Sequence, residues 1–414
     1  MMQKMLSVYN KKTLSIVVLI SASIFYISCE DEQYPDDIWD QNDTGNPTPV
    51  ITSVDPPDSA FAGADEITIN GQYFSSSTNE ILVYFNSELG DILQASETSI
   101  VVSPPNIVAD SIEIKVAIQG AFLFGVYENY YTLYPRIVKY GNFDPFEESV
   151  WGLETDNDEN LYVGLSIFPE GTIEKLSPPD AERDSSFINA VLATPLSIRI
   201  GPDNQIYYVD GSNPYIIKHD LTTGEPSYNT LPGIAADLDF DENGNLYCGG
   251  SGKEIYLVLT DLTSTVVADY MDINIKAIRV YNNYVYVAGN YLGTSLDIPA
   301  AGIWRNQILS SSGSLGDMEL VLDWVEMSGS NSNITCLTFD ENGKMYISTD
   351  NNFGIATYDL DGNFITLYPK IISAPITKMT WGAGNYLYLN YRGDPRAIYR
   401  LIMYEQGAPY YGRP

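Results

Sequence analysis

The stretch Asp239 to Gly249, DFDENGNLYCG, decides how this chain folds, because variants of it return through the last two thirds of the sequence. Each copy begins with an alternating apolar run, passes through a turn rich in Asp, Asn and Gly, and resumes as a β-branched and aromatic run around a tyrosine. This pattern predicts two strands joined by a hairpin. The six copies are Glu154 to Gly164, Arg199 to Val209, Asp239 to Gly249, Arg279 to Ala288, Thr338 to Ser348 and Thr380 to Asn390.

The spacing of the copies indicates the architecture. Their tyrosines are Tyr162, Tyr207, Tyr247, Tyr286, Tyr346 and Tyr388, separated by steps of 45, 40, 39, 60 and 42 residues. Another strand signal follows each copy, at 173–176, 216–219, 255–259, 302–308, 354–358 and 397–402. Repeats of roughly 40 to 50 residues with several short strands are typical of propeller blades, because one blade cannot bury both of its faces alone. We therefore predict a six-bladed β-propeller over residues 135–405 and a C-terminal tail over 406–414.

Two of the repeats, residues 210–225 and 348–369, resemble the NHL repeat, in which Tyr-Val-x-Asp-x-x-Asn precedes an Ile-rich strand that ends in Asp-x-x-Gly. The resemblance implies an NHL-like propeller and specifies no ligand, because such folds bind proteins, RNA or glycans and include some enzymes. The sixth repeat shows no fourth strand after Ile402. Residues 132–137 nearly repeat residues 366–371, so we expect the segment near 132–140 to supply that strand and close the ring.

Residues 47–134 form a separate unit with alternating strands between Gly, Pro and Asn turns. The segments 49–56 (PVITSVDP), 67–71 (ITING), 83–85 (VYF) and 100–104 (IVVSP) resemble the IPT/TIG domain, an immunoglobulin-like sandwich that acts as a spacer near membrane anchors. The predicted fold class is therefore all-β, with an immunoglobulin-like sandwich followed by a six-bladed propeller.

The first 28 residues have the pattern of a signal peptide, with Lys4, Lys11 and Lys12 before an apolar run from Leu14 to Ile27. The cysteine that follows, Cys29, comes after a small residue and resembles the lipidated cysteine of bacterial lipoproteins. A plain secretory signal with an incidental cysteine is the alternative.

Residues 29–46 are predicted to form an acidic tether. Its start, Glu30 to Glu32, resembles the tag by which Bacteroidota export lipoproteins to the outside of the outer membrane, although an ordinary acidic tether would look the same. The resemblance implies a lipid-anchored protein of the outer membrane that faces outward.

Composition excludes several functions. The chain has 54 acidic and 21 basic residues and a formal net charge of −33, which disfavours nucleic acid as a partner because that affinity depends on Lys and Arg. A single histidine, His219, excludes His pairs and triads, and we expect it on the surface of a strand. Cys248 and Cys336 fall in the third and fifth repeats, with no Cys-x-x-Cys spacing, so both are predicted to be buried free thiols and no zinc site is expected.

One polar position recurs at the start of each copy. Because the first strand of a blade borders the axis, these residues should form one axial polar ring. Its members are Glu154, Arg199, Asp239, Arg279, Thr338 and Thr380. One interpretation pairs Glu154 with Arg199 and Asp239 with Arg279, which satisfies buried charges. The other makes the ring the floor of a ligand pocket.

Metal chemistry is also disfavoured. Lactonases of the gluconolactonase type hold a divalent cation on the axis of a similar propeller, but Arg199 and Arg279 in the ring would repel such a cation. The turns at 156–160, 241–244 and 340–343 look like calcium loops but lack the 12-residue frame, so we interpret them as Asx turns of hairpins. We predict no metal, no cofactor and no catalysis.

The loops after the tyrosine strands should gather on one face of the propeller, where a rigid scaffold usually carries binding residues. Mixed aromatic, amide and charged side chains there suit sugar faces and hydroxyls. The candidate ligand-binding residues are Asp210, Asn290, Tyr291, Asn351, Tyr391 and Arg392. We therefore predict a non-catalytic surface lipoprotein, an accessory glycan-binding protein of an outer-membrane uptake system. The alternative is a scaffold that binds another outer-membrane protein, and the sequence does not decide between the two.

Overall fold

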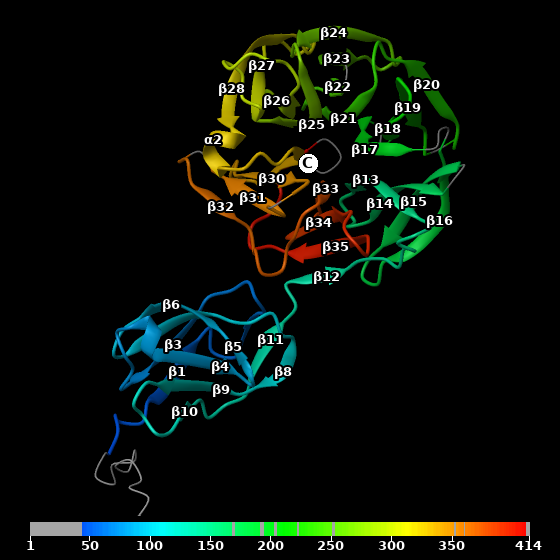
Figure 1. Ribbon diagram of the computed structural model, residues 1–414. Coiled ribbons are helices and arrows are strands. Elements are labelled where there is room, and N and C mark those ends of the chain that lie inside the picture. The colour runs from blue at the N-terminus through cyan, green and yellow to red at the C-terminus, as the bar shows by residue number, and fades with distance from the viewer. Residues whose placement is uncertain are drawn as a thin grey trace, which may run out of the picture.

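A computed structural model describes residues 44–167, 170–190, 194–202, 205–221, 223–250, 253–351, 353–359 and 361–410. The predicted signal peptide, Cys29 and the acidic run Glu30 to Glu32 lie outside the described residues. Figure 1 shows a small β-sandwich joined to a ring of six sheets, which confirms the predicted fold class. No helix in the described part of the chain is long and apolar enough to span a membrane.

The sandwich has two four-stranded sheets and a small third one. Their strand orders are β1-β3-β7-β6, β10-β9-β4-β5 and β2-β11-β8. The strands are β1 (Val50–Asp55), β2 (Ser59–Phe61), β3 (Ile67–Gln72), β4 (Ile81–Phe85), β5 (Glu88–Leu89), β6 (Asp91–Ala95), β7 (Ser99–Ser103), β8 (Ala109–Ile112), β9 (Ile114–Ile118), β10 (Gly125–Val126) and β11 (Tyr131–Tyr134), with the 3-10 turn η1 (Thr78–Glu80) before β4. Alternating residues of these strands, such as Ile67 and Ile69, face one buried core.

Each of the six remaining sheets is a four-stranded antiparallel blade. Blade 1 has β13 (Ser149–Thr155), β14 (Leu161–Ile167), β15 (Glu170–Ser177) and β16 (Glu182–Asn189). Blade 2 has β17 (Pro195–Gly201), β18 (Gln205–Asp210), β19 (Tyr215–His219) and β20 (Pro226–Thr230). Blade 3 has β21 (Ala235–Phe240), β22 (Leu246–Gly250), β23 (Glu254–Val258) and β24 (Ser264–Asp269).

The second half of the ring follows the same order. Blade 4 has β25 (Ile273–Tyr281), β26 (Tyr284–Tyr291), β27 (Ala301–Ile308) and β28 (Leu315–Asp323). Blade 5 has β29 (Ile334–Phe339), β30 (Met345–Thr349), β31 (Ile355–Tyr358) and β32 (Phe364–Thr366). Blade 6 has β33 (Ile376–Trp381), β34 (Tyr386–Tyr391), β35 (Ala397–Ile402) and β12 (Ile137–Lys139). The 60-residue step is explained by the long strands β27 and β28 and by the helix α2 (Trp324–Ser328), which the carboxylate of Asp323 caps at 3.0 Å.

The predicted closure of the ring is confirmed for residues 137–139 of the expected segment and is wrong for residues 132–134, which belong to the sandwich. Strand β12 pairs antiparallel with β35, Val138 opposite Arg400, and becomes the outer strand of blade 6. The preceding strand β11 belongs to the sandwich, where it pairs with β2 and β8. The edge of β35 is thereby covered by a strand from the other end of the propeller sequence, so the ring has no open seam there.

The recurring tyrosine has a structural role in three of the hairpins. Asp241 accepts hydrogen bonds from the backbone N–H groups of Asn243 and Asn245 at 2.9 and 2.8 Å, and its second oxygen accepts from the hydroxyl of Tyr247 at 3.4 Å. Asp340 with Tyr346 and Asp156 with Tyr162 repeat this arrangement. Each turn carboxylate is thus used inside its own hairpin, as the Asx-turn interpretation predicted.

A buried arginine lies where the sandwich meets the propeller. The guanidinium of Arg136 is 4.5 Å from the ring centroid of Phe61, 4.0 Å from that of Tyr404 and 4.8 Å from that of Tyr368. Its Nη1 is 3.7 Å from Asp65, and the hydroxyl of Tyr404 donates to the same carboxylate at 2.7 Å. Because these residues come from both domains, they hold the sandwich against blades 5 and 6.

The prediction for His219 is wrong. The side chain is buried and stacks on Tyr208 with ring centroids 5.9 Å apart. Burial lowers the pKa of His219, so the neutral form is favoured. The sequence pattern missed this because β19 is covered on both faces by its neighbours, unlike a half-exposed strand.

Candidate functional site

The first strand of every blade lines the propeller axis, and these strands contact each other around the ring. We call the end of the axis where they begin the loop face, and the end where they pass into hairpin turns the turn face. Side chains two residues apart on a strand point the same way. The axis is therefore lined by successive levels of side chains between the two faces.

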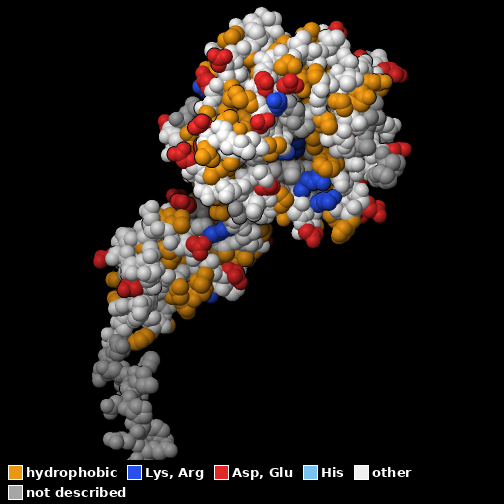
Figure 2. Space-filling model, turned by 45° about the horizontal axis from the view of Figure 1, so that its top comes forward, with side chains coloured by type: hydrophobic (Ala, Val, Ile, Leu, Met, Phe, Trp, Pro, Cys, Tyr) orange, Lys and Arg blue, Asp and Glu red, His pale blue; other side chains and the backbone are white. Residues whose placement is uncertain are grey.

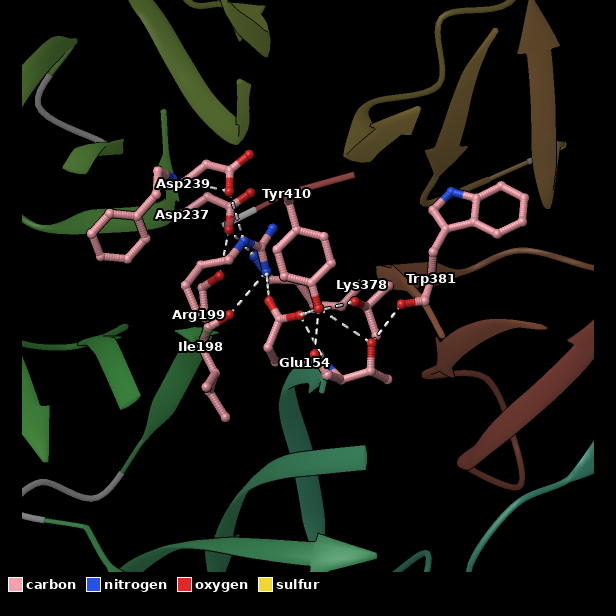
Figure 3. Close-up of polar contacts among 12 residues, drawn as sticks. Glu154, Ile198, Arg199, Asp237, Asp239, Lys378, Trp381 and Tyr410 are labelled. Atoms are coloured by element: carbon pink, nitrogen blue, oxygen red, sulfur yellow. Dashed lines mark hydrogen bonds and ion pairs between the residues drawn. The ribbon is translucent and has the colours of Figure 1, made fainter. Parts of the chain in front are cut away.

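The axial polar ring lies toward the turn face, and its charged members are buried. Arg199 donates to Glu154 at 2.7 Å through Nη1 and to Asp239 at 3.1 Å through Nε (Figure 3). Burial alone would lower the pKa of Arg199, but Glu154, Asp239 and Asp237 outweigh it and raise the pKa. A single arginine thus joins the carboxylates of blades 1 and 3.

The expected pair of Asp239 and Arg279 does not form. Arg279 donates instead to Asp237 at 2.6 Å, and Lys378 donates to the same carboxylate at 3.2 Å. Asp239 uses its second oxygen to accept from the backbone N–H of Val280 at 2.8 Å. Asp237 was missed because it lies one level deeper, two residues before the ring position on β21, as Lys378 does on β33.

These two levels contain three carboxylates, Glu154, Asp237 and Asp239, and three cations, Arg199, Arg279 and Lys378, so their formal charges cancel. Burial alone would raise the pKa of Asp237, but Arg279, Lys378 and Arg199 outweigh it and lower the pKa well below its usual range. The network is the kind in which removal of one partner leaves a buried charge uncompensated.

The C-terminal segment closes the turn face over the ring. Gly407 forms a bridge with Asp340, and the backbone N–H of Ala408 donates to the carbonyl of Phe339 at 3.0 Å. The hydroxyl of Tyr410 reaches the axis and donates to Glu154 and to the carbonyl of Thr155 (Figure 3). The cavity left between Tyr410 and the ring has a volume of about 40 Å³, enough for water but not for a sugar.

A β-bulge interrupts each first strand close to the loop face. In β25, for example, Ile275 pairs with Gly289 and Ala277 with Ala288, so Lys276 has no partner on the next strand. The residues at this point of the other five strands are Trp151, Leu196, Ala236, Thr335 and Thr377. Bulges turn a side chain out of the regular alternation, and they are frequent beside functional sites.

All six bulge residues line one pocket at the centre of the loop face, with a volume of about 560 Å³. This is within the size range of small-molecule sites. The pocket is also lined by Asn274, Asn290, Leu292, Asn333, Ile334, Asp350, Lys378 and Arg392. The bulges therefore form a ring of six side chains, which we call the bulge ring, beneath a rim of loop residues.

The charge of this pocket is opposite to that of the whole chain. Among the described residues, three basic side chains, Lys276, Lys378 and Arg392, line it against one acidic residue, Asp350. Figure 2 shows Lys and Arg side chains gathered around the middle of the propeller on the side that it presents. Burial and the neighbouring Lys378 lower the pKa of Lys276, whereas Asp350 acts to raise it.

Arg392 and Trp151 form the aromatic side of the pocket. The guanidinium lies 3.7 Å from the centroid of the indole ring and donates to the carbonyl of Val150 at 3.4 Å. The indole N–H of Trp151 and the hydroxyl of Thr377 are buried, and neither has a hydrogen-bond partner among the described residues. The pocket thus combines an aromatic wall with a planar cation, and two of its lining residues carry buried polar groups without a partner among the described residues.

Two of the six candidate ligand-binding residues, Asn290 and Arg392, line this pocket. The Asn290 amide joins blades 4 and 5. It donates to the backbone carbonyl of Ile334 at 3.4 Å and accepts from the backbone N–H of Ile334 at 3.3 Å. Only Arg392 of the six therefore presents a charged group there.

The other four candidates do not line the pocket. Asp210 is buried and accepts from the backbone N–H groups of Ser212 and Asn213, both at 2.8 Å. The hydroxyl of Tyr291 accepts from the N–H of Ser295 at 3.2 Å, and Tyr391 packs against Tyr399. The carbonyl of Asn351 accepts from Ser332 and Thr349.

A larger hollow of about 1030 Å³ lies on the turn face, between the hairpins of blades 3 and 4 and the C-terminal segment. Its lining includes Asp241, Glu242 and Glu341 and, among the described residues, no Lys or Arg. The two hollows therefore differ in charge as well as in volume. Within the described residues no group of three or more His, Cys, Asp or Glu side chains could hold a metal ion.

Comparison with known families supports the two-domain description. Residues 49–133 match the model of the IPT/TIG domain, which confirms that prediction, and residues 328–351 match the model of the two component regulator propeller. No curated protein matches the chain.

Several solved structures share the fold over most of both chains. An auxiliary nutrient binding protein from Bacteroides thetaiotaomicron VPI-5482 is 12% identical, with 86% of this chain and 98% of that chain covered and a TM-score of 0.52. An auxiliary nutrient binding protein from Bacteroides ovatus ATCC 8483 is also 12% identical, with 86% and 98% covered and a TM-score of 0.50. A proposed phosphatase from Bacteroides thetaiotaomicron VPI-5482 is 12% identical, with 86% and 97% covered and a TM-score of 0.53. At this identity the likeness establishes the fold.

Proposed function

We propose that this protein is a non-catalytic binding protein of the bacterial cell surface that captures a glycan for an outer-membrane uptake system. The observation that carries the proposal is the pocket of about 560 Å³ on the loop face, which the bulge ring builds from all six blades. Each bulge lies between paired stretches of the same strand, and a site that is formed before the ligand arrives loses little conformational freedom on binding.

The chemistry of the lining suits a saccharide. The indole of Trp151 offers an apolar surface, and Asn274, Lys276 and Arg392 offer polar groups around it. Sites for small ligands combine a mainly apolar wall with a few placed polar groups in this way. The likeness of the fold to two proteins described as auxiliary nutrient binding proteins from Bacteroides supports a role in nutrient capture.

Lipidation at Cys29 and export to the outer surface are part of the same proposal. They rest on the apolar run from Leu14 to Ile27, the residue Ser28 and the acidic run Glu30 to Glu32. The sandwich would then hold the propeller away from the membrane, with the loop-face pocket open to the outside.

A glycan array tests the proposal. The protein, made without residues 1–28 and with Cys29→Ser, is applied to the array and positive oligosaccharides are measured by calorimetry. Trp151→Ala is expected to weaken binding by roughly tenfold or more, because truncation of an aromatic anchor removes most of its contact area. The matched control is Tyr228→Ala, an exposed aromatic residue on the outer strand of blade 2. Binding that survives Trp151→Ala unchanged would place the ligand elsewhere.

The second candidate function is a scaffold for another outer-membrane protein. It is favoured by three consecutive exposed apolar residues of the sandwich, Phe122, Leu123 and Phe124. They lie beside the point where the chain enters the sandwich, since Asn46 bridges to Ala121. Exposed apolar groups of this kind mark interaction sites. Cross-linking in cells from a residue placed at Leu123 would capture a defined outer-membrane protein if this candidate is right, and no protein partner if it is wrong.

A further inference from the structure

The cations of the loop-face pocket are only partly matched by acids. Lys378 is paired with Asp237 at 3.2 Å. Lys276 and Arg392 have no carboxylate within ion-pair distance among the described residues. Asp350, the one acidic residue of the lining, is engaged by the N–H of Asn333 at 3.0 Å and by its side-chain amide at 2.7 Å.

This pattern contrasts with the levels just below. In the two levels toward the turn face, three carboxylates pair with three cations and their charges cancel. Buried charge on the axis is therefore neutralised at those levels. At the bulge ring, Lys276 is instead half-buried next to a second lysine, and that neighbour lowers its pKa in addition to burial. Like charges brought together in a partly buried site destabilise the unliganded protein.

The local geometry makes this cation face the pocket. A regular strand would turn the residue at 276 to the opposite side of the sheet, and the bulge between Ile275 and Ala277 prevents this. Arg392 enters from the end of β34, and the indole of Trp151 supports its guanidinium at 3.7 Å. A guanidinium is planar and presents its N–H groups as a rigid fork, which suits bidentate contact with a carboxylate or a sulfate.

We propose that the loop-face pocket binds an acidic saccharide, with the carboxylate or sulfate group of one sugar held between Lys276, Lys378 and Arg392. This inference rests on the proposed function and narrows its ligand class. The anion supplies the negative charge that the pocket lacks, and the sugar ring occupies the space beside Trp151. The acidic surface of the chain as a whole, with a net charge of −33, then disfavours binding of the same polymer elsewhere on the molecule.

The test uses matched pairs of oligosaccharides. Oligogalacturonides carry carboxylates, and their methyl esters have the same backbone without charge. Oligosaccharides of a sulfated galactan carry sulfates, and chemical desulfation gives the neutral counterpart. Calorimetric titration of the protein without residues 1–28 is run at about 0.01 M and about 0.15 M salt, because screening weakens a charge-dependent contact.

We expect at least one acidic oligosaccharide to bind, its neutral counterpart to bind at least tenfold more weakly, and the affinity to fall with salt. Lys276→Met and Arg392→Met should each weaken binding by roughly tenfold or more. Lys115→Met, in a half-exposed pair with Glu113 of the sandwich, is the matched control and should change nothing. The acidic series that binds identifies carboxylate or sulfate as the recognised group.

A second measurement does not depend on a ligand. Lys276→Met should leave the melting temperature of the free protein unchanged or raise it, because it removes a half-buried charge beside Lys378. A clear fall, larger than that of Lys115→Met, would overturn the argument that this charge is kept at the expense of stability.

The outcomes separate the inference from the proposed function. Equal binding of neutral and acidic oligosaccharides, sensitive to Trp151→Ala but not to Lys276→Met, would overturn the acidic ligand and leave glycan capture standing. Failure of every oligosaccharide, acidic or neutral, would overturn both.

Discussion

Asp237→Asn is the substitution that tests most directly how the propeller axis is held together. The carboxylate is fully buried and accepts from Arg279 at 2.6 Å, from Lys378 at 3.2 Å and from the N–H of Ile278 at 3.0 Å. Asparagine keeps the shape but removes the charge, and its amide N–H2 replaces one of two oxygens that both accept hydrogen bonds, one from Ser197 and Lys378 and the other from Arg279 and Ile278. Two buried cations then lose their shared partner, and breaking such a pair costs about 3 to 5 kcal/mol.

The expected effect is large enough for a thermal melt. At about 2 °C per kcal/mol for a domain of this size, the melting temperature of the propeller should fall by roughly 6 to 10 °C. The control is Asp317→Asn, an exposed acid on β28, for which a change within about 0.5 kcal/mol is expected. A shift no larger than that of Asp317→Asn would refute the reasoning and show that the network is solvated.

The loss of stability caused by Asp237→Asn should depend on pH. Because the folded-state pKa of Asp237 is depressed below the unfolded value of about 3.9, its charge stabilises the native state above that value, and this contribution is lost as the pH falls toward the folded pKa. The difference in unfolding free energy between the wild type and Asp237→Asn should therefore be constant above roughly pH 5 and shrink at lower pH. A difference that grows on acidification would contradict a depressed pKa.

Three further predictions follow from other contacts. Tyr410→Phe removes the hydroxyl that donates to the buried Glu154, so the melting temperature should fall by roughly 3 to 6 °C, whereas Tyr130→Phe on the exposed surface of the sandwich should have no effect. Arg136→Met removes the cation held between Phe61 and Tyr404, and small-angle scattering should show a larger maximum dimension than for the wild type or for the exposed control Lys139→Met. An unchanged scattering curve would mean that other contacts fix the junction. Cys29→Ser should release the protein from the membrane fraction of cells, and retention there would rule out a lipid anchor at this residue.

The fold could be predicted from the sequence because its signals are local. The hairpin copies carry their own turn chemistry, since Asp241 and Tyr247 lie in one short segment and bond to each other. The period of the copies then gives the blades, and the lack of a fourth strand after Ile402 indicated that a segment from before the first blade closes the ring, as β12 does. The position of Glu154 and Arg199 in one axial ring could also be predicted, because side chains of an unbroken strand alternate with a period of two.

The ion-pair partners on the axis and the loop-face pocket could not be predicted, because they depend on contacts between distant segments of the chain. The partner of Arg279 lies on a neighbouring blade, and the choice of Asp237 over Asp239 depends on how far the two blades are offset along the axis. Tyr410 reaches Glu154 across more than two hundred residues of sequence, which no local pattern records. The pocket was hidden for a further reason: a bulge inverts the side to which Lys276 points, so strict alternation assigns it to the wrong surface. The sequence by itself determined that the chain builds six blades, and the bulges that only the folded chain reveals decided which side chains those blades present at the loop face.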